Sequence, residues 1–185
     1  MKEIEIPEMI NGRVVTKIDN GAFRDNRTLE KITIPDSVIS IGRYAFQNCV
    51  SLKTIEGAEG VTDMGDKTFL NTAWKNQCQD EVVVLNGKIA VALNTAATHV
   101  TIPEGVTILA DYLFSDGDRN VMTVDLPQSL TVLGSGCFMY CENLQEIMFP
   151  RNLKQISFWS FYGCKSLKSV SIPQNIYQIE GGLSL

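Results

Sequence analysis

The stretch IPDSVISIGRYAFQNC, residues 34–49, is the clearest copy of a unit that recurs along this 185-residue chain. Six phenylalanines mark the unit, and they are Phe23, Phe46, Phe69, Phe114, Phe138 and Phe161. Successive members lie 23, 23, 45, 24 and 23 residues apart. A fixed period of this size indicates a repeat architecture, in which each unit buries its apolar side only by stacking on its neighbours. We therefore expect function on an extended surface rather than in a pocket.

Each unit of about 23 residues predicts two short extended segments and little helix. In the first segment, apolar and polar residues alternate up to a proline, as in residues 29–35. This alternation, ended by proline, is typical of a half-buried strand. A second apolar pair follows, such as Val38 with Ile41, and the phenylalanine then closes the coil. The fold class predicted is a β-rich solenoid, with residues 1–185 as a single domain.

Residues 70–101 interrupt the period. Within them, two apolar runs at 82–85 and 88–93 flank Asn86-Gly87, a strong hairpin signal because both turn residues need positive φ. We therefore interpret 70–101 as an irregular unit in which one β-hairpin replaces a repeat.

The two ends of the chain also depart from the pattern. Residues 1–23 contain extra residues and a turn signal at Asn11-Gly12, which predicts a cap-like N-terminal unit. Residues 172–185 form an incomplete last repeat, with Ser184 where the phenylalanine is expected. An uncovered terminal coil would expose apolar surface and strand edges, which makes end-to-end self-association a further expectation.

The composition excludes several classes of function. A net charge of −5 and a pI near 4.9, with no clustered basic face, argue against a nucleic-acid partner. No apolar run approaches the roughly 18 residues that cross a bilayer, so we expect no membrane insertion. The opening residues are too charged for the apolar core of a signal peptide. The chain is therefore either cytoplasmic or exported by a signal that is not part of this sequence.

The sequence predicts no catalytic, cofactor-binding or metal site. Motifs for phosphate, dinucleotide or zinc binding and for serine hydrolases are missing, and the single histidine, His99, falls in an outward slot of a strand. Three residues after the phenylalanine, small polar or thiol side chains recur, and they are Asn26, Cys49, Thr72, Gly117, Cys141 and Cys164. We expect them to hydrogen-bond the backbone of a turn and the cysteines to be buried free thiols.

The pattern I-P-x-x-V-x-x-I-G-x-x-A-F-x-x-C in residues 34–49 resembles the BspA-like leucine-rich repeats of bacterial surface proteins. The N-T-A-W motif at 71–74 and the hairpin after it resemble an interruption that recurs in that family. The resemblance covers nearly the whole chain and implies a right-handed leucine-rich-repeat superhelix. It also implies a secreted or cell-surface bacterial protein that binds proteins, including host extracellular proteins, in adhesion. A structural spacer or display stalk within a larger surface protein is the alternative.

Outward side chains on the first strand of each unit should form two polar columns, with rungs about 4.8 Å apart. The first column is expected to contain Glu3, Lys31, Thr54, His99, Thr123, Glu146 and Ser169. The second is expected to contain Glu5, Thr33, Glu56, Thr101, Asp125, Met148 and Ser171. The candidate partner-binding strand face comprises Lys31, Thr33, Thr54, Glu56, His99, Thr101, Thr123, Asp125, Glu146 and Met148. The alternative is that these polar residues only keep an exposed sheet soluble.

Overall fold

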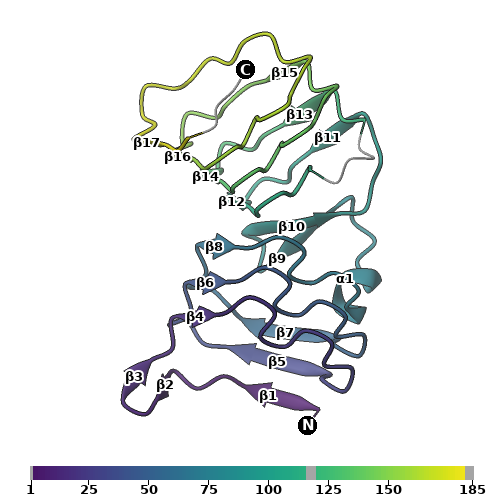
Figure 1. Cartoon of the computed structure of the whole chain (residues 1–185), viewed down its shortest axis with the longest axis vertical. Coiled ribbons are helices and arrows are strands. Elements are labelled where there is room, and N and C mark those ends of the chain that lie inside the picture. Colours follow the sequence, from purple (N-terminus) through teal and green to yellow (C-terminus); the bar gives the residue numbers. More distant parts are fainter. Residues whose placement is uncertain (1, 116–119, 182–185) are drawn as a thin grey trace. The chain divides into compact units, whose positions relative to one another are not determined.

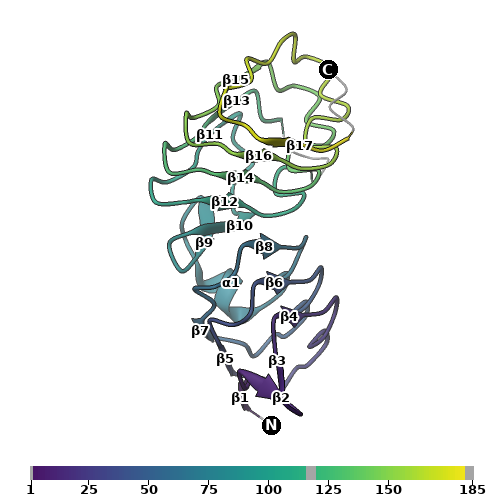
Figure 2. The same cartoon turned by 90° about the vertical axis from the view of Figure 1, so that its left-hand side faces the viewer.

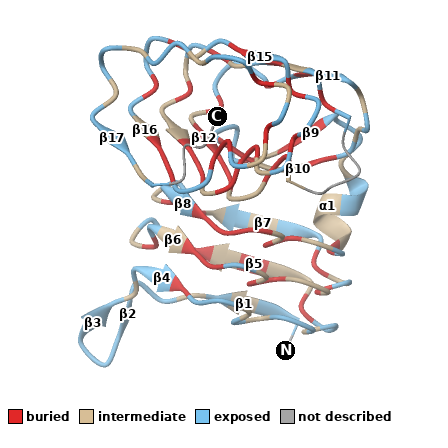
Figure 3. Cartoon of the chain, turned by 45° about the horizontal axis from the view of Figure 1, so that its top comes forward, coloured by how far each residue is buried: buried red, intermediate tan, exposed pale blue. Residues whose placement is uncertain are grey.

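The computed structural model describes residues 2–115 and 120–181 and forms two compact units, Met1–Gln79 and Asp80–Leu185 (Figure 1). Both units are β-solenoids, as the repeat predicts. Each regular coil contributes one strand to each of two parallel sheets, and buried residues alternate with exposed ones along the coils (Figure 3).

The first unit contains two three-stranded parallel sheets. The sheet made by the first strand of each coil consists of β1 (Glu3–Glu5), β5 (Lys31–Ile34) and β7 (Thr54–Gly57). The sheet made by the second strands consists of β4 (Lys17–Ile18), β6 (Ser40–Ile41) and β8 (Asp63–Met64). A small antiparallel hairpin joins β2 (Met9–Ile10) to β3 (Arg13–Val14), and its turn lies at Asn11-Gly12 as predicted. Met9, Ile10 and Val14 are exposed, and a capping role for residues 1–23 stays a prediction.

The second unit has the same plan with a longer second sheet. Its first-strand sheet consists of β11 (His99–Thr101), β13 (Thr123–Asp125) and β15 (Glu146–Ile147). Its other sheet has six strands in the order β17 (Gln178–Ile179), β16 (Gln155–Ile156), β14 (Val132–Leu133), β12 (Ile108–Leu109), β10 (Ile89–Leu93) and β9 (Val82–Leu85). The successive coils are best followed in Figure 2.

The hairpin predicted at Asn86-Gly87 is confirmed. Both residues have positive φ, and β9 pairs antiparallel with β10. Because β10 then pairs in parallel with β12, the hairpin supplies a strand to the second sheet of its unit in place of a regular coil. The single helix of the described residues is α1 (Ala73–Gln77), and the buried Thr72 side chain caps it by accepting the Lys75 N–H at 3.1 Å.

The phenylalanines form two internal stacks. In the first unit, ring centroids of Phe23 and Phe46 are 5.1 Å apart, and those of Phe46 and Phe69 are 5.5 Å apart. In the second unit, Phe138 lies between Phe114 at 4.6 Å and Phe161 at 5.3 Å. The planes are within 20° of parallel, so each ring covers the next one along the solenoid.

The recurring thiols satisfy the turn backbone as predicted. The Sγ atoms of Cys49, Cys141 and Cys164 each donate to the carbonyl oxygen of a phenylalanine in the preceding coil, at 3.0, 3.3 and 3.1 Å. All five cysteines lie among the described residues and are thiols, with Cys78 the least buried. Burial raises the pKa of Cys164 to about 11, and it raises that of Cys137 well above the ordinary range. Gly117 of the same predicted column lies outside the described residues.

The sequence pattern did not reveal a backbone feature of the coils. Within residues 2–115 and 120–181, the positions two residues before and two residues after each of the six recurring phenylalanines take a left-handed conformation. The set before it is Gly21, Tyr44, Lys67, Tyr112, Gly136 and Trp159, and the described set after it is Asp25, Asn48, Asn71, Tyr140 and Gly163. Large side chains rarely adopt positive φ, so the stacking of the coils must hold this conformation in place.

Candidate functional site

The polar columns predicted on the first strands have the expected register within each unit. Lys31 lies opposite Glu3 and Thr54 in the first unit. Thr123 lies opposite His99 and Glu146 in the second. Residues 168–172 form no strand, so the expected strand there was wrong, although Ser169 and Ser171 are exposed as predicted. The predicted face is therefore two separate three-stranded surfaces, one in each unit, and its binding role stays a prediction.

The surface of the first unit neutralises part of its own charge. The Lys31 Nζ atom lies 2.7 Å from Glu56 Oε1, which joins the first column to the second column of the next strand. The hydrogen bond to Glu56 raises the pKa of Lys31. In the strand register, Thr54 lies opposite Lys31, and Thr33 lies opposite Glu56. A cation from outside would have to compete with Lys31 for that carboxylate.

On the second unit, His99 links three strand residues. Its Nδ1 atom lies 2.7 Å from Thr123 Oγ1, and its Nε2 atom lies 3.3 Å from Asp125 Oδ2 and 3.4 Å from Thr101 Oγ1. An imidazole that carries its proton on Nε2 satisfies the first two contacts together, because it donates to Asp125 and accepts the Thr123 hydroxyl proton. Sequence reasoning placed His99 outward, which is confirmed, but found no acidic partner for it.

A hydroxyl, an imidazole and a carboxylate are also the groups of a nucleophilic triad. Here the Thr123 N–H and the neighbouring Met122 N–H both donate to the Thr98 carbonyl, so the sheet consumes the donors that could stabilise an oxyanion. The His99 side chain is 54% exposed, and its surroundings do not exclude water. The arrangement therefore lacks the free oxyanion donors and the water exclusion that acyl transfer by such a triad requires.

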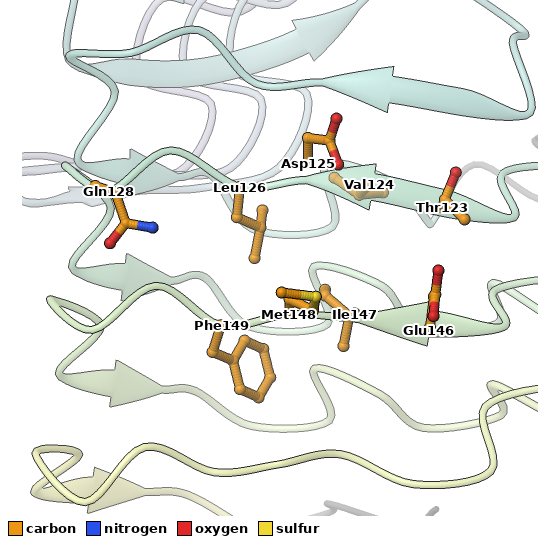
Figure 4. Close-up of a pocket in the computed structure, with 9 residues that line it drawn as sticks. All are labelled: Thr123, Val124, Asp125, Leu126, Gln128, Glu146, Ile147, Met148 and Phe149. Atoms are coloured by element: carbon orange, nitrogen blue, oxygen red, sulfur yellow. The ribbon is translucent and has the colours of Figure 1, made fainter.

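A groove of about 290 Å³ runs between β13 and β15 (Figure 4). We call it the β13–β15 groove. Its lining residues are Thr123, Val124, Asp125, Leu126, Gln128, Glu146, Ile147, Met148 and Phe149. Four of them belong to the predicted face, and these are Thr123, Asp125, Glu146 and Met148. The structure thus gathers four of the ten predicted residues at one hollow, whereas Lys31, Thr33, Thr54 and Glu56 lie in the other unit.

The groove has a polar residue at each end. Thr123 and Glu146 stand at one end, Met148 lies near the middle, and Gln128 lies at the other end beyond Leu126 and Phe149 (Figure 4). Met148 is 81% exposed, an unusual fraction for a large apolar side chain. Leu126 and Phe149 are half-buried and were missed by sequence reasoning. The available signal was that both precede a proline where other coils have isoleucine.

Glu146 is the uncompensated charge of this surface. Among the described residues, no hydrogen bond or ion pair reaches its carboxylate, although Asp125 is engaged by His99. The His99–Asp125 contact follows the same diagonal as Lys31–Glu56, from the first column to the second column of the next strand. Glu146 stands in the first column of the edge strand β15, where the described sheet offers no next strand.

A second hollow, of about 310 Å³, is lined by Met139, Trp159 and Tyr162. Trp159 is half exposed, whereas Trp74 is half-buried and packs on Phe69 at 5.0 Å. Within residues 2–115 and 120–181, no three or more histidine, cysteine and acidic side chains gather in a way that could hold a metal ion. The same residues include no helix with the length and apolarity needed to cross a bilayer.

Comparison with known proteins agrees with this architecture. Residues 16–115 and 90–183 match the family model described as "BspA type Leucine rich repeat region", in six copies. No curated protein sequence gives a match.

Solved structures that are similar to this chain include three bacterial proteins. The pneumococcal vaccine antigen PcpA is 18% identical, with a TM-score of 0.52 over 97% of this chain and 56% of that protein. A leucine-rich repeat protein from Bacteroides ovatus is 29% identical, with a TM-score of 0.48 over 96% of this chain and 47% of its own. A leucine rich cell surface protein from Faecalibacterium prausnitzii is 20% identical, with a TM-score of 0.48 over 97% of this chain and 77% of its own. The chain spans about half the length of the first two.

Proposed function

Because the chain belongs to the BspA-type leucine-rich-repeat family, we propose that it is a non-catalytic protein-binding module of a secreted or cell-surface bacterial protein. Repeats of this type are generally protein-interaction modules of bacterial surface proteins. Adhesion through a host extracellular protein is the role we propose for this chain.

The observation that carries the proposal is the β13–β15 groove on the exposed side of the first-strand sheet. The strands β13 and β15 hold Thr123, Asp125 and Glu146 in register, and a surface of this kind suits a macromolecule. Its volume of about 290 Å³ accommodates a few side chains of a partner. An exposed Met148 beside polar residues also gives the mixed chemistry of protein contact surfaces, in which methionine is enriched.

Paired substitutions at matched positions test this role. Thr123 and Thr54 both lie in the first column, but only Thr123 lines the groove. We expect Thr123→Arg to weaken binding to a purified extracellular-matrix protein, measured by surface plasmon resonance, by about 10-fold or more, because an arginine would fill the groove. Thr54→Arg should bind like the unmodified chain.

Both variants must keep the circular dichroism spectrum of the unmodified chain for the comparison to count. Equal binding by the two variants would show that this surface is not the contact site. Failure of the unmodified chain to bind any member of a matrix-protein panel would favour the display-stalk alternative. Antibody labelling of intact cells of the encoding bacterium tests the surface location, and labelling only after permeabilisation would contradict it.

A further inference from the structure

We propose that the β13–β15 groove binds an extended segment of a partner protein in which one residue separates a lysine or arginine from an apolar residue. The inference deepens the proposed function and rests on it, because it names the chemistry of the partner at the same surface. Its starting point is the Glu146 carboxylate, which has no hydrogen bond or ion pair among the described residues.

The first unit shows how this kind of surface receives a cation. Lys31 extends across its sheet, and its Nζ atom comes within 2.7 Å of Glu56. On the second unit, His99 occupies the corresponding diagonal toward Asp125, at 3.3 Å. Glu146 has no equivalent cation within the described sheet. A partner's lysine or arginine would therefore complete at Glu146 the type of pair that Lys31 makes internally.

The neighbouring side chains match the rest of a long basic residue. Met148 lies beside Glu146 in the groove, whereas Phe149 packs against the core, with its ring centroid 5.7 Å from that of Phe161 (Figure 4). Lysine and arginine have apolar stems that pack along such surfaces while the charged group stays at a polar rim. An anionic ligand fits poorly, because Asp125 and Glu146 both line the hollow and their charges would repel it.

The geometry also fixes the spacing of the bound residues. Glu146 and Met148 are two residues apart, so their side chains leave the same side of the chain about 7 Å apart. In an extended partner, residues i and i+2 also share one side. A basic residue and an apolar residue with one residue between them can thus meet Glu146 and Met148 together. This pattern is the predicted recognition motif.

The probes are capped serine hexapeptides that contain one lysine and one leucine with a single residue between them. Both orders of the lysine and the leucine are tested. Fluorescence anisotropy of the tighter peptide should show an affinity loss of about 10-fold or more on Glu146→Gln, because the charge-assisted contact disappears. Glu56→Gln is the matched control and should leave the affinity unchanged, since that carboxylate already has Lys31. A peptide with norleucine in place of lysine should bind both variants equally weakly.

Equal affinity of the lysine peptide for Glu146→Gln and the unmodified chain would overturn the inference, as would equal binding of a glutamate peptide. The inference would also be overturned if putrescine displaced the peptide at concentrations below the peptide's own Kd. That result would indicate that the groove binds a free diamine. The two proposals fail separately. If Thr123→Arg abolishes matrix-protein binding but Glu146→Gln does not change it, the groove binds proteins by another chemistry. If Thr123→Arg changes nothing, the proposed function itself fails at this surface.

Discussion

Replacing Phe138 by alanine should destabilise the second unit by about 4–5 kcal/mol, toward the upper end of the range for a buried phenylalanine. Phe138 is fully buried and is the middle ring of its stack, with centroid distances of 4.6 and 5.3 Å to Phe114 and Phe161. Truncation removes the buried ring and leaves a cavity in a column that cannot collapse without shifting two coils. The loss of two ring contacts, each contributing about 0.5–1.5 kcal/mol beyond burial, places the cost high in that range.

Urea denaturation followed by tryptophan fluorescence is the assay. In a Trp74→Phe background, Trp159 alone reports, and it belongs to the second unit. The matched control is Phe158→Ala, because Phe158 is 48% exposed and lies outside the stack. We expect that control to cost about 1 kcal/mol. If Phe138→Ala costs no more than Phe158→Ala, the rings do not hold the coils together and the account of the core is wrong.

Two further predictions concern the backbone and the thiols. Gly57→Ala should lower the free energy of unfolding, measured by urea denaturation, by about 3 kcal/mol or more, because a Cβ there would overlap a facing carbonyl oxygen. Gly87 also has positive φ but lies in open space. Gly87→Ala should therefore lower that free energy by only about 1–2 kcal/mol. Equal costs would contradict the close approach of the coils at Gly57. Burial raises the pKa of Cys164 to about 11, whereas the unfolded-state pKa is near 9. Protonation of this thiol therefore contributes fully to the free energy of unfolding below pH 9, and the contribution is lost as the pH rises toward 11. Melting at pH 8 and pH 10.5 should show a smaller alkaline loss of stability in Cys164→Ala than in the unmodified chain, and an equal loss would argue against a buried thiol.

The fold could be predicted because its determinants are periodic. Phe46 and its equivalents recur at one spacing, and the alternation before each proline specifies the strand and its outward residues. Asn86-Gly87 likewise specifies a turn through local backbone preference alone. Such signals need no knowledge of the neighbouring coil. The left-handed conformation of Tyr44 and Trp159 is different, because tertiary packing overrides a local preference against it.

The candidate site was only partly predictable for the same reason. The alternation of apolar and polar residues predicted that Thr123, Asp125 and Glu146 face outward. A hollow, however, depends on how far adjacent strands extend and on which side chains flank them. The end of the columns at β15 arises because residues 168–172 do not pair as a strand, although their sequence continues the pattern. The diagonal contact of His99 with Asp125 joins positions 26 residues apart and follows from strand register rather than from any local motif.

The most direct test of the central claim, that the β13–β15 groove is the contact surface, is an NMR titration of the methionine methyl signals. The unmodified chain, labelled with ¹³C on its methionine methyl groups, would be titrated with the lysine–leucine hexapeptide. The Met148 signal should shift most, because Met148 lines the groove and is largely exposed. Met139, which lines a different hollow of the second unit, provides the internal comparison. A larger shift at Met139, or no shift at Met148 at saturating peptide, would contradict the account.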